Sequence, residues 1–95
     1  MLRLSITRAA KNNLQEAVRY YNRQQPGLGK RFRKEVEDSF ERIKAMPQSA
    51  SILYDTVRYK MVDGFPFIVV YEFDEVEVII LSVFNTHKNP DEINP

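Results

Sequence analysis

The sequence predicts an α+β fold, in which a short N-terminal strand and an antiparallel helical hairpin pack on a small antiparallel β-sheet. Three observations lead to this prediction. Apolar residues recur at helical spacing over two consecutive segments, residues 8–24 and 28–46. Pro26 and Gly27 separate the segments by a turn so short that the helices must be neighbours. From residue 57 onward the apolar runs have strand spacing.

The N-terminal half supplies the first strand and both helices. Apolar and polar residues alternate over residues 2–6, which predicts a strand with one apolar face. Thr7 follows it, and its hydroxyl can accept a hydrogen bond from a free N–H group of the first helix. The apolar stripes of the two helices consist of Ala10, Leu14, Ala17, Val18 and Tyr21, and of Leu28, Phe32, Val36, Phe40 and Ile43.

Three strands are predicted in the C-terminal half, at residues 57–61, 67–73 and 76–84. Asp63-Gly64 and Asp74-Glu75 form the turns between them, and residues 47–54 are expected to be a loop. Each helix has one apolar stripe, so the hairpin can cover only one face of the sheet. We expect a partner chain or a second copy to cover the other face, which should carry Ile68, Val70, Ile79, Leu81 and Val83.

Length and composition predict one folded domain over residues 1–95. Hydrophobic residues make up 43% of the chain and charged residues 28%, the usual proportions of a globular protein. The chain contains no cysteine, which excludes a disulfide framework and suits a reducing compartment. It has no signal-like apolar segment and no run of membrane-spanning length. These features predict a cytoplasmic protein without a membrane partner.

Charge is distributed unevenly along the chain. Residues 1–46 contain 11 Lys and Arg and 5 Asp and Glu, a net charge of +6, whereas residues 47–95 contain 3 and 8, a net charge of −5. A nucleic-acid surface, if the protein has one, is therefore expected on the helices. The alternative is that these charges only solvate helix faces, because pairs such as Lys34 and Asp38 lie four residues apart.

Few residues are candidates for chemistry. The three glycines fit no phosphate-binding loop, and a single His without Cys predicts neither a metal site nor a cofactor. Arg58 and Lys60 share one strand face, where they can contact phosphate or carboxylate groups or protect a sheet edge. His87 is the single histidine of the chain, a residue type used in acid–base chemistry, and it follows the last strand, although a histidine on a polar tail is often a bystander.

Nearly the whole chain resembles the RelE/ParE superfamily of bacterial toxins from type II toxin–antitoxin modules, and it is most similar to the ParE-like branch known as plasmid stabilisation proteins. The resemblance implies the fold described above. The matching residues are Tyr20-Tyr21, residues 25–29, Arg31-Phe32, residues 35–37, residues 43–47, Val57-Arg58, residues 65–67, Val70-Tyr71, residues 81–84 and Asn89-Pro90.

The resemblance also implies a partner, a small antitoxin whose C-terminal segment wraps the toxin. We expect that segment to be acidic and amphipathic, so that its carboxylates meet cations on the helical hairpin. The candidate antitoxin-binding residues are Arg19, Arg23, Lys30 and Arg33.

The superfamily divides by target. RelE-like members cut mRNA on the ribosome with basic sheet residues and a Tyr or His near the C-terminus, positions that Arg58, Lys60 and His87 can match. The nucleases also carry an arginine on the strand that corresponds to residues 67–73, and this chain has none there. ParE-like members are associated with inhibition of DNA gyrase. The leading hypothesis is therefore a toxin that binds a protein target such as gyrase. The alternatives are a ribosome-dependent mRNA endoribonuclease and a non-toxic binding module of the same fold.

Overall fold

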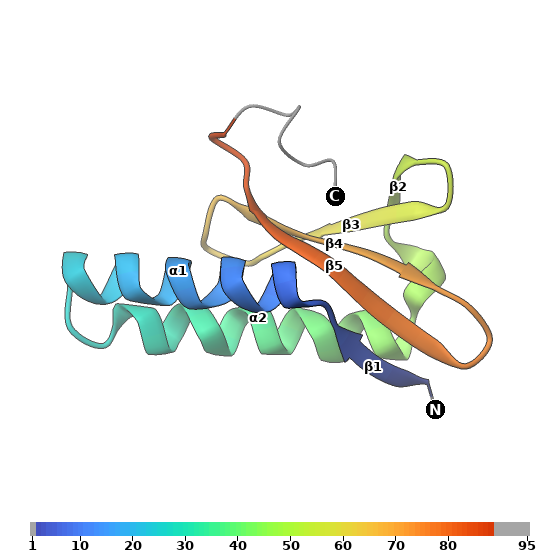
Figure 1. Cartoon of the computed structure of the whole chain (residues 1–95), viewed down its shortest axis with the longest axis horizontal. Coiled ribbons are helices and arrows are strands. Elements are labelled where there is room, and N and C mark those ends of the chain that lie inside the picture. Colours follow the sequence, from blue (N-terminus) through green and yellow to red (C-terminus); the bar gives the residue numbers. More distant parts are fainter. Residues whose placement is uncertain (1, 89–95) are drawn as a thin grey trace.

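The computed structural model describes residues 2–88 and shows the predicted α+β architecture (Figure 1). Both helices lie side by side on one face of a five-stranded sheet. In chain order the elements are β1 (Arg3–Ile6), α1 (Arg8–Gln24), α2 (Leu28–Ala45), the 3₁₀ turn η1 (Pro47–Ser49), β2 (Ser51–Tyr54), β3 (Val57–Met61), β4 (Phe67–Phe73) and β5 (Glu77–Asn85).

The sheet has more strands than the sequence predicts. Its order is β1-β5-β4-β3-β2, with β1 parallel to β5 and all other neighbours antiparallel. The prediction of a loop over residues 47–54 is wrong, because this segment forms η1 and then β2 at the sheet edge. Pro47 and two serines are typical of a loop, but Ile52 pairs with Arg58 of β3 and Leu53 packs against a buried cluster.

The helical hairpin is closed by specific backbone contacts. Thr7 caps α1, since its hydroxyl oxygen accepts from the Ala10 N–H at 3.1 Å. Gly27 adopts φ +89°, a left-handed conformation that lets the chain reverse before α2. The Asn22 side chain then accepts from the Gly29 N–H at 2.8 Å, which ties the two helices together beside the turn. Over residues 2–88, no helix is long and apolar enough to cross a membrane.

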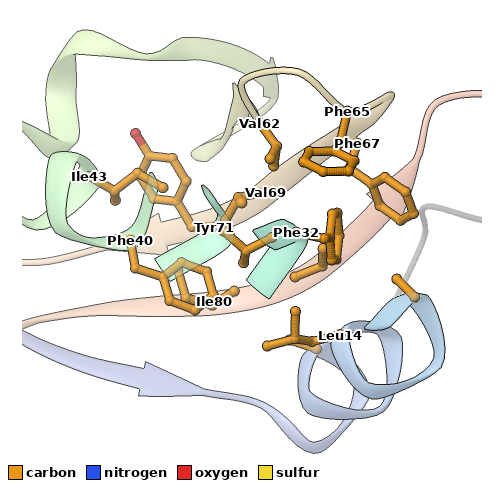
Figure 2. Close-up of a cluster of buried hydrophobic side chains, with 14 of the residues drawn as sticks. Leu14, Phe32, Phe40, Ile43, Val62, Phe65, Phe67, Val69, Tyr71 and Ile80 are labelled. Atoms are coloured by element: carbon orange, nitrogen blue, oxygen red, sulfur yellow. The ribbon is translucent and has the colours of Figure 1, made fainter. Parts of the chain in front are cut away.

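The main hydrophobic core lies between the helices and the sheet (Figure 2). Phe32 and Val36 of α2 are completely buried there, and each such side chain stabilises the fold by about 1.5–3 kcal/mol. Tyr71 of β4 is also fully buried, and its hydroxyl donates to the Pro47 carbonyl oxygen at 2.7 Å. That bond connects the middle of the sheet to η1, which directly follows the helical hairpin.

The opposite face of the sheet is better covered than the sequence suggests. Ile68 and Val70 are buried in a second cluster with Val57 and Phe84. Val83 was expected on this face, but it packs in the main core on the helix side. The reason is a β-bulge in β5, where Tyr71 pairs with Ile80 and Val70 with Ser82, so that one extra residue reverses the alternation. The second cluster is completed by Leu53, Tyr59 and Leu81, which are partly buried.

Candidate functional site

A basic groove runs between α1 and the end of β5, with a volume of about 910 Å³. Its walls come from two segments that are distant in sequence, the outer face of α1 and the turn directly after β5. Its polar and aromatic lining residues are Asn13, Glu16, Arg19, Tyr20, Tyr21, Arg23, Phe67, Ser82, Phe84, Asn85, His87 and Lys88.

The helical wall of the basic groove is fixed against the sheet by Asn13. Its side-chain oxygen accepts from the Ser82 hydroxyl at 3.1 Å and from the Val83 N–H at 3.2 Å. These bonds join α1 to β5 near the bulge, where β1 has ended. Because α1 is a regular helix, the position of Asn13 sets the direction in which Arg19 and Arg23 project.

The strand wall is held by a turn directly after β5. The Asn85 side-chain oxygen accepts from the His87 N–H at 2.8 Å, and the Asn85 carbonyl oxygen accepts from the Lys88 N–H at 3.0 Å. The carbonyl oxygen of Pro66, directly before β4, accepts from the Thr86 N–H at 2.8 Å and from the Thr86 hydroxyl at 3.0 Å. His87 and Lys88 are therefore exposed on an anchored turn.

An aromatic cluster supports the tip of the basic groove. The Tyr21 ring lies 5.1 Å from the Phe32 ring and 5.0 Å from the Phe65 ring, measured between centroids. Burial raises the pKa of the Tyr21 hydroxyl above its ordinary value, with a smaller contribution from neighbouring Tyr20. Tyr20 packs edge-on against Tyr21 at 5.3 Å and remains 51% exposed.

Positive charge dominates this site. Arg19, Arg23 and Lys88 face a single carboxylate, Glu16, which gives a net charge of +2 with His87 neutral. Within residues 2–88, the ion pairs all involve α2: Lys34 with Asp38, Arg42 with Asp63, and Lys44 with Glu41. The cations of α1 have no such partner in this part of the chain, so they can accept an external anion.

The four predicted antitoxin-binding residues do not form one patch. Arg19 and Arg23 lie together in the basic groove. Arg33 lines a second groove of about 610 Å³, where Lys11 and three carboxylates make the rim mixed in charge. Lys30 is exposed on the first turn of α2 and lines neither groove. The second groove has an apolar floor of Leu4, Ile6, Leu14 and Phe40.

The three candidate nuclease residues are not brought together. Arg58 donates to the carbonyl oxygens of Ala50 at 2.6 Å and Gln48 at 3.2 Å, and its guanidinium lies 5.7 Å from the Phe73 ring centroid. His87 lies in the basic groove, which neither Arg58 nor Lys60 lines.

The strand register gives the scale of this separation. Arg58 pairs with Tyr71, Lys60 with Val69, and the end of β5 pairs with Phe67. Tyr71 and Phe67 are four residues apart, which is roughly 13 Å along β4.

Some groove residues were not singled out from the sequence. Tyr20 was noted only as part of a family motif, and Lys88 was not named. The available signal was that Tyr20 directly follows Arg19 and lies outside the apolar stripe of its helix. Asn13 had no comparable signal, because its partner in β5 is 70 residues away. Among residues 2–88, no group of three or more His, Cys, Asp or Glu side chains could hold a metal ion.

A family model described as the ParE toxin of the type II toxin–antitoxin system parDE matches residues 4–90. This chain belongs to the ParE toxin family. A comparison with curated proteins found no match.

Among solved structures, a chain of the chromosomal ParDE toxin–antitoxin system from P. aeruginosa is similar to this ParE-family protein, with a TM-score of 0.80 and 19% sequence identity. The alignment covers 90% of this chain and 96% of that one. At this identity the likeness shows a shared fold. Together with the family match, it places the helical hairpin and sheet in the ParE toxin architecture.

Proposed function

We propose that this ParE-family toxin acts by binding a protein target, with DNA gyrase as the leading candidate, and that an antitoxin neutralises it. The observation that carries the proposal is the position of Arg58. Its guanidinium is bonded to two backbone carbonyl oxygens and lies far from His87 along the sheet. Cleavage of RNA requires a base, an acid and cations that converge on one phosphate. Binding requires no such convergence.

The antitoxin is proposed to place an acidic, amphipathic segment in the basic groove. Carboxylates of that segment would pair with Arg19 and Arg23, and its apolar side chains would cover the exposed ring of Tyr20. Such a segment is too polar to fold alone and becomes ordered on the toxin. A partner that binds only the native toxin stabilises it by mass action.

A supercoiling assay tests the target. Purified toxin is added to gyrase and relaxed plasmid, and in parallel to translating ribosomes with a defined mRNA. We expect supercoiling to be inhibited and the mRNA to stay intact. Unchanged supercoiling at stoichiometric excess, together with mRNA cleavage, would identify an endoribonuclease and contradict the proposal.

Thermal melting tests the antitoxin site. The midpoint of the toxin should rise when its cognate antitoxin is added at saturation. An Arg19→Glu, Arg23→Glu variant should lose most of that rise. Lys34→Glu with Arg42→Glu is the matched control, because it reverses two α2 charges that lie outside the basic groove. A wild-type melting midpoint that the antitoxin leaves unchanged would contradict the assignment of the antitoxin to the basic groove. An equal loss of the rise in the control variant would contradict it as well.

A further inference from the structure

We propose that the basic groove binds single-stranded nucleic acid, with phosphates on its cations and one base stacked on Tyr20. The inference concerns the free toxin, and it holds whether the cellular target is gyrase or another protein. It starts from a difference between the helices. The cations of α2 are partly neutralised by ion pairs within the domain, whereas Arg19 and Arg23 of α1 have no acidic partner among residues 2–88.

Cations stand on both walls of this groove. Arg19 and Arg23 are one helical turn apart on α1, about 6 Å along its axis. Lys88 and His87 face the groove from the anchored turn after β5. A strand that runs between the walls can therefore place successive phosphates against α1 and the turn. A volume of about 910 Å³ lies at the upper end of ordinary ligand sites, which leaves room for a nucleotide unit.

Tyr20 supplies the second chemical requirement. Its ring is 51% exposed and lines the groove together with the two arginines. The ring is held edge-on by Tyr21, which is itself fixed among Phe32 and Phe65. A rigid exposed ring loses little conformational entropy when a base stacks on it. Proteins that bind single strands combine such rings with a cationic groove.

This combination distinguishes a single strand from a duplex, which does not offer an unpaired base for stacking. An acidic protein segment that lays apolar side chains on Tyr20 would use the same cations and the same ring. The acidic β4–β5 turn of a second copy, around Asp74 and Glu75, is the alternative occupant that this chain itself could provide. The groove is also the proposed antitoxin site, so antitoxin and nucleic acid should compete.

Fluorescence anisotropy with labelled DNA and RNA strands of about 12 nucleotides tests the inference. Binding should weaken between about 50 and 200 mM salt, because phosphate contacts release counterions. Arg19→Ala with Arg23→Ala should lower the slope of log affinity against log salt by about 1.4, at 0.7 for each lost contact. Lys34→Ala with Arg42→Ala is the charge-matched control and should leave the slope near the wild-type value.

Tyrosine variants test the stacking role separately. Tyr20→Ala should raise the Kd at least about fivefold, while Tyr20→Phe should keep the wild-type Kd because it retains the ring. Tyr54→Ala removes another exposed tyrosine and should have no effect. Circular dichroism verifies that each variant is folded.

Three outcomes would overturn the inference. These are no binding at about 50 mM salt, an equal loss in the control pair, and tighter binding of a duplex than of the single strand. Concentration-dependent self-association that the Arg19→Ala, Arg23→Ala variant abolishes, without strand binding, would assign the groove to a second copy. Wild-type toxin that inhibits gyrase but binds no single strand would contradict this inference and leave the proposed function standing.

Discussion

Arg58 donates to the carbonyl oxygens of Gln48 and Ala50, and it thereby holds the connection between η1 and β2 on the edge of the sheet. The sequence correctly placed Arg58 and Lys60 on one strand face. It could not identify the partners of Arg58, because they lie in a segment that was predicted to be a loop. The role of a surface cation depends on contacts that are distant in sequence.

Tyr71 tests the contact between the sheet and the end of the helical hairpin. Tyr71→Phe keeps the ring but leaves the buried Pro47 carbonyl oxygen without its donor. We expect the free energy of unfolding to fall by about 1–3 kcal/mol. Urea denaturation measures it, with Tyr54→Phe as the exposed control. Equal stability of Tyr71→Phe and wild type would show that this hydrogen bond does not stabilise the fold.

The hydrogen bonds of Asp74 predict that the stability of the fold depends on pH. Its carboxylate accepts from the Glu77 N–H at 2.9 Å and the Val76 N–H at 2.8 Å, and these bonds lower its pKa below the ordinary value. A lowered pKa in the folded state stabilises the protein above the unfolded-state pKa, and this contribution is lost as the pH falls through the folded-state value. Asp74→Asn should therefore be less stable than wild type at pH 7.

The difference in free energy of unfolding between wild type and Asp74→Asn should shrink below about pH 4, where the wild-type carboxylate becomes protonated. Denaturation of both proteins across this range measures it. Glu75→Gln controls for the loss of one negative charge in the same turn. A difference between wild type and Asp74→Asn that stays constant with pH would contradict the assignment.

At the scale of elements, periodicity predicted both helices, β1 and the three long strands, because each has a regular apolar spacing. It missed β2, which is only four residues long and follows a proline and two serines. It also placed Val83 on the wrong face, because alternation cannot reveal a bulge that arises from pairing with β4. Both errors concern how strands pair with each other, and the apolar spacing within one segment carries no information about its partners.

Gly29 tests the close approach of α1 and α2. A Cβ atom added there would contact the Val18 carbonyl oxygen and lie 2.6 Å from the Asn22 side chain. Gly29→Ala should therefore force the hairpin apart and lower the free energy of unfolding by about 1–3 kcal/mol, as overpacking does elsewhere. Lys30→Ala, one residue further along α2, is the control and should change stability little. An unchanged midpoint for Gly29→Ala would mean that the helices adjust without cost.

At the scale of the whole molecule, the fold brings Arg19, Arg23 and Lys88 to one groove, where α1 meets the end of β5. The sequence predicted basic helices and named Arg19 and Arg23, but it grouped them with Lys30 and Arg33. Helical spacing alone does not tell which groove a residue lines once two helices and a sheet are packed. The turn that adds Lys88 to the basic groove is brought there by the sheet.

Growth after induced expression without antitoxin tests most directly the claim that this ParE-family chain is a toxin that acts by binding. Wild-type protein should arrest bacterial growth, and co-expression of its cognate antitoxin should restore growth. Lys60→Ala should still arrest growth, because the basic groove does not include Lys60 whereas the nuclease alternative requires it. Normal growth with abundant folded wild-type protein, or loss of the arrest in Lys60→Ala, would contradict the account.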